Sequence, residues 1–212
     1  SYIADETAAL GHTEETVPGT APTFDNAGST DGVICSVCGE ILTAQETIPA
    51  LDYNDGIIPV SALTASAGDF YASDVPANAL DGDFATMWHT DWYGSSRDNH
   101  WIQFEINGSY QVDGLRYKPR TDMNREGQPQ LNGTITQFKI QVSNDGITFV
   151  DVATGSWDAN QNWKTVEFDA QTVKYVRLVS VDACTDNDSV FASAAEIRLT
   201  GEETVAPPHE HA

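Results

Sequence analysis

Basic residues are scarce in this sequence of 212 residues. Ten Lys and Arg stand against 32 Asp and Glu, which gives a formal net charge of -22. A field of that sign repels phosphate backbones and anionic lipid head groups, so it disfavours nucleic acids and membrane surfaces as partners. The spare carboxylates suit divalent cations, although the solubility that a secreted protein needs explains the acidity equally well. We expect no nucleic-acid partner.

Long apolar runs are also missing. No stretch approaches the roughly 18 consecutive apolar residues that span a bilayer, so we expect no membrane insertion. The opening "SYIADETAALGHTEE" lacks a basic region followed by an apolar core and therefore does not resemble a signal peptide. We interpret the sequence as an internal piece of a longer protein that is secreted or attached to the bacterial cell surface, and we expect a monomer.

Cysteine is rare as well, since three residues are too few for a disulfide framework. Cys184 stands alone, whereas Cys35 and Cys38 form a CxxC pair in "ICSVCGE". Such a pair is half of a zinc site, a redox pair or a short disulfide. Zinc takes four N or S ligands, and His12 with the two cysteines offers only three. An incomplete zinc set and a metal-free spacer both stay open.

Composition divides the chain into three parts. Residues 1–57 are rich in Thr, Glu, Ala and Pro and contain no Trp, Lys or Arg, so we expect a mostly irregular or short-β segment there. Residues 58–201 hold nearly all the large aromatic side chains and form the expected folded domain. Residues 202–212, from "EETVAPPHEHA", are expected to be a linker or tail.

The central block predicts short strands separated by turns. In "QFKIQVS" apolar and polar residues alternate, "SNDG" follows as a turn and "ITFVDVA" returns, so 137–153 is predicted to be a hairpin. No amphipathic helix of 12 residues is present. The other predicted strands are 101–106, 163–168, 173–181 and 196–201. Short strands at this spacing predict an all-β fold, a sandwich or jelly roll with function carried by loops at one end.

The motifs of this block resemble those of discoidin-like domains, also called coagulation-factor type C domains. They occur in the family's order: "NALDGDFATMWHT", "HWIQFEI", "VDGLRYKPR", "FKIQVSNDGITFVDVATGSW", "KYVRLVSV" and "FASAAEIRLTG". The bacterial branch, the family 32 carbohydrate-binding modules, matches best over about residues 58–201. The resemblance implies a jelly-roll β-sandwich, a structural calcium ion and weak binding of galactose-type sugars by loops.

The first segment resembles something else. "GHTEETVPGTAPTFDNAGSTDGVICSVCGEILTAQETIPAL" is similar to a small Cys-rich repeat of bacterial surface proteins. Phe24 stands where that repeat places its first cysteine, so the resemblance implies a degenerate repeat whose fourth zinc ligand is missing.

Calcium takes six to eight oxygen ligands, and Asp81-Gly82-Asp83 offers two carboxylates on a sharp turn with the Thr86 hydroxyl nearby. Alone, this short pattern favours a plain Asp-Gly turn over a metal site. The family resemblance implies a ligand set that would staple the two ends of the domain together: the carbonyl of Ala79, Asp81, Asp83, Thr86, the carbonyl of Ala195, and Glu196.

A sugar ring needs directional hydrogen-bond partners at its hydroxyl edge and an aromatic plane under its C–H face. The resemblance implies that the polar partners are His89, Arg120 and Asn132, that Phe191 is the platform and that Trp92 is a flanking ring. Each has a structural alternative: a core hydrogen bond for His89, an ion pair with Asp122 for Arg120, and a turn for Asn132-Gly133. Phe191 between polar "DNDS" and small "ASAA" is poorly explained by core packing.

These residues favour a non-catalytic module that recognises terminal galactose or N-acetylgalactosamine on glycans and targets a covalently linked carbohydrate-active enzyme to its substrate. The alternative is a discoidin domain of a surface protein that binds lipids or proteins, against which the charge of -22 argues. An enzyme is the third class, but we find no nucleophile elbow, zinc hydrolase motif or acid/base pair in the sequence.

Overall fold

The computed structural model describes residues 11–93, 96–185 and 191–204. The chain divides into two compact units, Ser1–Asp52 and Tyr53–Ala212. The expected tail 202–212 lies largely outside the described residues, since only its first three residues are described. Among the described residues, no helix combines the length and the hydropathy needed to cross a membrane.

The first unit consists of short strands. A three-stranded sheet has the order β1-β3-β4, and a second pair joins β2 to β5. The bounds are β1 Glu14–Val17, β2 Gly28–Ser29, β3 Gly32–Cys35, β4 Ile41–Thr43 and β5 Thr47–Ile48. This arrangement agrees with the short-β segment expected from composition.

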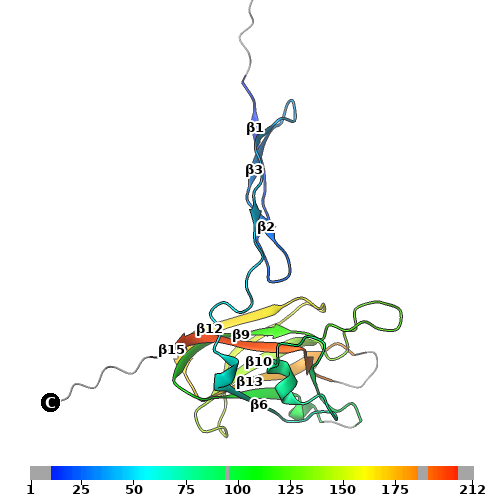
Figure 1. Cartoon of the computed structure of the whole chain (residues 1–212), viewed down its shortest axis with the longest axis vertical. Coiled ribbons are helices and arrows are strands. Elements are labelled where there is room, and N and C mark those ends of the chain that lie inside the picture. Colours follow the sequence, from blue (N-terminus) through cyan, green and yellow to red (C-terminus); the bar gives the residue numbers. More distant parts are fainter. Residues whose placement is uncertain (1–10, 94–95, 186–190, 205–212) are drawn as a thin grey trace, which may run out of the picture. The chain divides into compact units, whose positions relative to one another are not determined.

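The second unit is a β-sandwich, as the alternation of apolar and polar residues predicts. One sheet has the strand order β11-β10-β13-β8-β6 and the facing sheet has the order β12-β9-β15 (Figure 1). Their bounds are β6 Leu63–Ala67, β8 Trp101–Ile106, β9 Tyr110–Lys118, β10 Ile135–Ser143, β11 Val150–Ser156, β12 Lys164–Thr172, β13 Tyr175–Ala183 and β15 Glu196–Glu203. The predicted hairpin is present, because β10 and β11 pair antiparallel.

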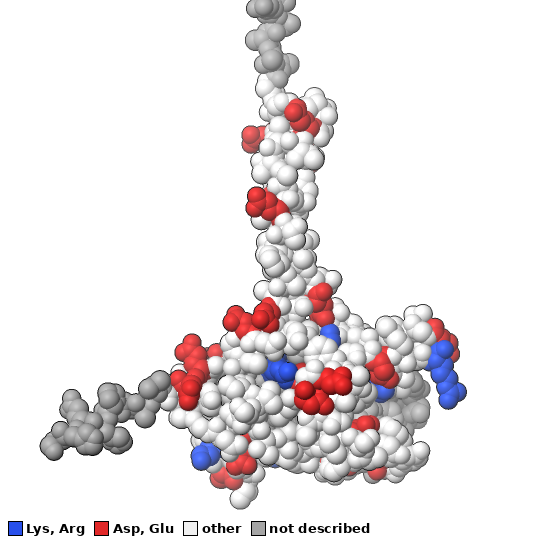
Figure 2. Space-filling model, viewed as in Figure 1, with Lys and Arg blue, Asp and Glu red and all other residues white. Residues whose placement is uncertain are grey.

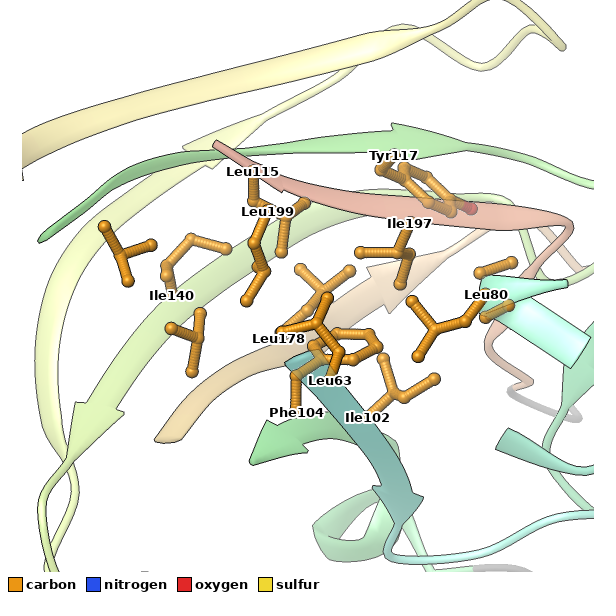
Figure 3. Close-up of a cluster of buried hydrophobic side chains, with 14 of the residues drawn as sticks. Leu63, Leu80, Ile102, Phe104, Leu115, Tyr117, Ile140, Leu178, Ile197 and Leu199 are labelled. Atoms are coloured by element: carbon orange, nitrogen blue, oxygen red, sulfur yellow. The ribbon is translucent and has the colours of Figure 1, made fainter. Parts of the chain in front are cut away.

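The core lies between the two sheets. Figure 3 shows side chains from both layers pointing toward one another, with Phe104, Ile140 and Leu178 from one sheet and Leu115, Ile197 and Leu199 from the other. All six are at most 1% exposed, which is the burial that strands packed face to face produce. Tyr117 is fully buried at the edge of the same core.

Short elements at one end of the sandwich carry the loops that matter below. They are the 3-10 helices η2 Pro76–Leu80 and η3 Arg97–Asn99, and the two-residue strands β7 Trp88–His89 and β14 Ser193–Ala194. The 3-10 helix η1 Val60–Ala62 precedes β6 at the opposite end of that strand. β7 and β14 pair antiparallel, so residues more than a hundred positions apart lie side by side. On the face drawn in Figure 2, acidic side chains clearly outnumber basic ones.

Candidate functional site

The pairing of β7 with β14 places His89 at the centre of a group of loops. His89 lies opposite Ser193, and its neighbour Trp88 lies opposite Ala194. Trp88 is fully buried and anchors this strand through its indole N–H, which donates to the Asp69 carbonyl at 2.9 Å. The anchor fixes the direction of the next side chain, because successive residues of a strand point to opposite faces.

His89 is 2% exposed. Its Nδ1 lies 2.6 Å from the Thr90 carbonyl, and a carbonyl only accepts, so Nδ1 carries the hydrogen and Nε2 is the acceptor of the neutral ring. Burial lowers the pKa of His89 below its ordinary value, and the Thr90 carbonyl opposes this shift only partly. The ring is therefore neutral at pH 7, with one nitrogen able to accept a hydroxyl proton.

Aromatic rings surround His89. The Phe191 ring centroid lies 5.6 Å from that of His89, and the Trp92 centroid lies 5.1 Å away in an edge-on arrangement. Tyr71 packs against Trp92 at 4.0 Å, and Tyr93 lies 6.0 Å from both. Trp92 keeps 38% of its surface exposed and Tyr93 keeps 78%, so this cluster forms an apolar rim open to solvent.

Arg120 and Asn132 lie at the two ends of a long loop and meet there. The Arg120 Nη1 donates to the Asn132 carbonyl at 3.1 Å, while Nε and Nη2 form a bidentate pair with the Asp122 carboxylate at 2.7 and 2.8 Å. The ion pair with Asp122, which is the structural alternative to a sugar-binding role for Arg120, is therefore formed. These bonds use three of the five guanidinium N–H groups, and the pair fixes the orientation of the others.

Gly133 joins this loop to the strand beside His89. Its carbonyl accepts from the Ser193 N–H at 2.8 Å, and its φ of 86° lies in the left-handed region that favours glycine. A Cβ at this position would lie 2.8 Å from the Ser193 Oγ. The buried Tyr117 adds a second tie, because its hydroxyl donates to the Ser193 carbonyl at 2.8 Å and accepts from the Ile135 N–H at 3.0 Å.

The structure therefore brings the five residues of the expected sugar site to one end of the sandwich. Ring contacts join His89 to Trp92 and Phe191, and Arg120 contributes to the electrostatic environment of His89. Sequence reasoning missed Tyr71 and Tyr93, which complete the aromatic rim. Tyr93 stands beside Trp92 in "DWYG", and that neighbour was the available signal. No feature of the sequence indicated Tyr71. In the structure the next residue, Ala72, has a positive φ of 47°, which is uncommon for a residue other than glycine.

The expected calcium loop folds against the start of the last strand. The Gly82 N–H donates to the Glu196 Oε2 at 2.9 Å, so the loop contacts the start of β15. The Thr86 hydroxyl lies 2.7 Å from the Asp81 Oδ2 and 2.9 Å from the Asp83 carbonyl. Asp83 turns its carboxylate to the Ala85 N–H at 2.9 Å, which leaves its carbonyl facing Thr86.

This arrangement tests whether the donors fit a calcium ion. Asp81, Thr86 and Glu196 present hard oxygens. Ala79, two residues before Asp81, and Ala195, directly before Glu196, are both fully buried. Glu196 is itself fully buried, and such a carboxylate requires a cation. In this structure the cation is Arg198, whose Nη1 forms an ion pair with the Glu196 Oε1. The donors fit calcium chemistry, and Arg198 supplies the compensating charge.

Another group of ligand-type side chains lies in the first unit. In residues 11–93, 96–185 and 191–204, the only set of three or more His, Cys, Asp or Glu with all ligand atoms within 4.8 Å of one another is His12, Cys35 and Cys38. The carboxylates of the calcium loop do not converge to this degree, so carbonyl and hydroxyl oxygens would complete that site.

Comparison with known proteins places the second unit among recognised domains. A family model described as F5/8 type C domain matches residues 61–197. The family 32 carbohydrate-binding module of NanJ from Clostridium perfringens, solved in complex with galactose, is 31% identical and has a TM-score of 0.58, over 68% of this chain and 97% of that one. CpGH89CBM32-5 from the same organism, solved with GalNAc-β-1,3-galactose, is 28% identical with a TM-score of 0.57, over 68% and 99%.

A longer protein with an enzyme name is also among the relatives. A galactose oxidase of Gibberella zeae is 34% identical over 125 residues, which is 57% of this chain. The chain spans only 17% of the length of that oxidase.

Proposed function

Since the chain belongs to the F5/8 type C domain family and, within it, to the family 32 carbohydrate-binding modules, we propose that residues 58–201 bind terminal galactose or N-acetylgalactosamine of glycans. The module is a non-catalytic binding domain. The observation that carries the proposed specificity is the meeting of His89, Phe191 and Trp92 at one rim with Arg120 and Asn132 beside them. The relatives solved with galactose and with GalNAc-β-1,3-galactose support the choice of sugar.

The proposed binding mode follows from the two faces of a sugar. The C–H face packs on Phe191, with Trp92 at its flank, because an aromatic ring buries apolar area with little loss of side-chain entropy. His89 accepts a hydrogen bond from a sugar hydroxyl through Nε2, and Arg120 donates a hydrogen bond to a hydroxyl oxygen. Asn132 offers both functions through its carboxamide. The bidentate pair with Asp122 holds the guanidinium in place before the sugar arrives, which reduces the cost of ordering it.

Such a site is shallow and holds one sugar ring. Three polar side chains and one platform correspond to dissociation constants from about tens of micromolar to millimolar, or roughly 4–6 kcal/mol. Binding of that strength becomes useful through tethering, because a second linked contact raises the effective concentration. We therefore propose that the module is linked to a carbohydrate-active enzyme in a longer protein that is secreted or displayed at the bacterial surface.

Calcium is the proposed structural ion of this module. Asp81, the Asp83 carbonyl, Thr86 and Glu196 would hold it, together with the carbonyls of Ala79 and Ala195. When bound, the ion would neutralise the carboxylates and fasten the loop 81–86 to β15. The same loop leads into β7, so the ion would also steady the strand that carries His89.

Titration calorimetry of the sugars into the whole chain tests this proposal. Galactose and N-acetylgalactosamine should bind, while glucose should not, because it lacks the axial hydroxyl. Phe191→Ala and His89→Ala should each abolish binding while the domain stays folded. The matched control is Phe149→Ala, which removes a phenyl ring that packs on Arg177. Wild-type affinity in both site variants would contradict the site.

The same protein distinguishes the alternative functions. Vesicles with anionic head groups test the lipid-binding alternative, for which the exposed Trp92 and Tyr93 would serve as an apolar contact. Vesicle binding without sugar binding would favour that alternative. Release of phenol from aryl galactosides would overturn the assignment as a non-catalytic module.

A further inference from the structure

The described part of the first unit, residues 11–52, has almost no hydrophobic core. Within residues 11–52 the buried residues are Gly28, Gly32 and Cys35, so a single side chain with apolar surface is buried. Segments of roughly 40 residues or fewer rarely fold on apolar burial alone and usually need a disulfide, a metal or a partner. All three cysteines of the chain are free in this structure. The fold of the first unit therefore calls for a different kind of cross-link.

The only cysteine pair of this unit sits in a tight turn at one end of the sheet. Glu14 pairs with Cys35 in the ladder of β1 and β3, and the Gly39 N–H closes the turn by donating to the Cys35 carbonyl at 2.8 Å. Gly39 adopts a φ of 75°, which glycine tolerates. The Ser36 N–H donates to the Thr13 carbonyl at 2.9 Å and so holds the chain next to His12 against this turn.

Two sulfurs and one imidazole nitrogen converge there. The ligand atoms of His12, Cys35 and Cys38 all lie within 4.8 Å of one another, and His12 Nδ1 is 3.5 Å from the Cys38 Sγ. Thiolate and imidazole are the ligands that zinc prefers, and the separations match neighbouring ligands of one tetrahedral ion with bonds of about 2.0–2.3 Å. Hard cations such as calcium prefer oxygen and do not suit this set.

The surroundings of the three ligands are polar. The backbone N–H groups of Val37 and Cys38 and the side chain of His12 contact the sulfur of Cys35, so this sulfur lies among hydrogen-bond donors rather than in an apolar core. On the far side of the imidazole, His12 Nε2 lies 3.2 Å from the Glu40 Oε2. A carboxylate that accepts from one ring nitrogen leaves the other as the lone-pair donor, the arrangement that orients histidine ligands toward metals.

The fourth ligand does not come from the position of Phe24. The ladder runs from Glu14–Cys35 through Val17–Gly32 to the Thr20–Ser29 bridge, which carries the chain steadily away from the turn. Position 24 lies beyond that bridge, and Figure 1 shows the turn after β3 and the loop between β1 and β2 at opposite ends of this unit. A cysteine there would not complete this set, so the Phe24 substitution leaves these three ligands intact.

We propose that His12, Cys35 and Cys38 bind one Zn²⁺ ion, whose fourth position is taken by water or by a donor from outside residues 11–52, and that this ion cross-links the turn end of the first unit. His12 and Cys38 are exposed, so the fourth position faces outward. Glu40 is a positioning residue that acts through His12. The ion joins the segment before β1 to the turn after β3 and so replaces the missing core at this end.

Metal analysis of the whole chain tests the inference. All proteins carry His209→Ala and His211→Ala to remove the histidines of the tail, and they are dialysed under reducing conditions against zinc. We expect one zinc per chain, and with cobalt in place of zinc a thiolate-to-cobalt charge-transfer band. Cys38→Ser should weaken binding by at least about 100-fold, and Glu40→Gln by about 10- to 100-fold with the cobalt band retained.

The matched control is Cys184→Ser, which removes a thiol from the second unit and should leave zinc binding unchanged. Melting of the second unit, followed separately, shows that each variant is intact outside the first unit. Zinc retained in Cys38→Ser, an equal loss in Cys184→Ser, or a Cys35–Cys38 disulfide in zinc-supplied protein would each overturn the inference. None of these results depends on whether the second unit binds a sugar.

Discussion

Replacing Arg198 with methionine is expected to make the second unit dependent on calcium. Arg198 is 6% exposed and forms the ion pair with Glu196, which is fully buried. Methionine keeps the apolar stem and removes the charge, so a buried carboxylate loses its partner. Breaking a buried pair in this way costs roughly 3–5 kcal/mol. For a unit of this size each kcal/mol corresponds to roughly 2–4 °C, so the melting temperature should fall by roughly 6–20 °C.

Calcium should reverse most of that loss. The ion would bring positive charge to Asp81 and Glu196 at the place that the guanidinium leaves. Calcium should also raise the free energy of unfolding of the wild-type protein, by roughly 2.7 kcal/mol when its concentration is a hundred times its dissociation constant. The assay is thermal unfolding of both proteins by circular dichroism, in millimolar calcium and in EDTA, with calcium affinity from calorimetry. Arg198→Met should bind calcium more tightly than the wild type.

Arg177→Met is the matched control. Arg177 lies on β13 between the rings of Trp101 and Phe149 and donates to the Gln103 side chain. Its replacement should destabilise the unit by the same amount with and without calcium. An equal loss for Arg198→Met in calcium and in EDTA would refute the reasoning, because the ion and the guanidinium would then not serve the same carboxylates.

Three further predictions concern the loops around His89. The pKa of His89 is lowered by burial, so galactose affinity measured by calorimetry should be constant above about pH 6.5 and fall in more acidic buffer. The stability of the folded unit should also fall as the pH is lowered, because His89 takes up its proton at a higher pH in the unfolded chain than in the folded one. Gly133→Ala should cost roughly 1–3 kcal/mol in chemical unfolding and weaken sugar binding, because a Cβ would meet Ser193. Tyr117→Phe leaves two buried backbone groups without the hydroxyl and should cost roughly 1–3 kcal/mol in the same assay.

The strands were predictable where one face is buried and the other is not. Alternation in "QFKIQVS" corresponds to β10, and the turn after it fixed the hairpin. β9, Tyr110–Lys118, is not among the strands that alternation predicts, because its register against β15 shifts at Asp113: Gly114 pairs with Thr200 and Val112 pairs with Gly201. Val112, Leu115 and Tyr117 are all buried, so the core-facing positions are three and then two residues apart, and such a bulge breaks the period of two.

The candidate site was predictable only where a motif was continuous in the sequence. His89, Trp92 and Phe191 lie in recognisable segments, whereas Tyr71 joins the rim through the fold alone. The burial of Arg198 could not be predicted, since a charge within "EIRLTG" favours a solvent-facing position. Arg198 is buried because the loop 81–86 covers the start of β15, and a contact across 114 residues leaves no trace in local pattern.

The most direct test is a titration of galactose and N-acetylgalactosamine into isotope-labelled protein, followed by indole and amide resonances. If a sugar lies on Phe191 and is held by His89, Arg120 and Asn132, the indole of Trp92 and the amides of those four residues should shift together and saturate with one dissociation constant. Shifts confined to another face, such as the groove lined by Val142, Asp145 and Val150, would contradict the account.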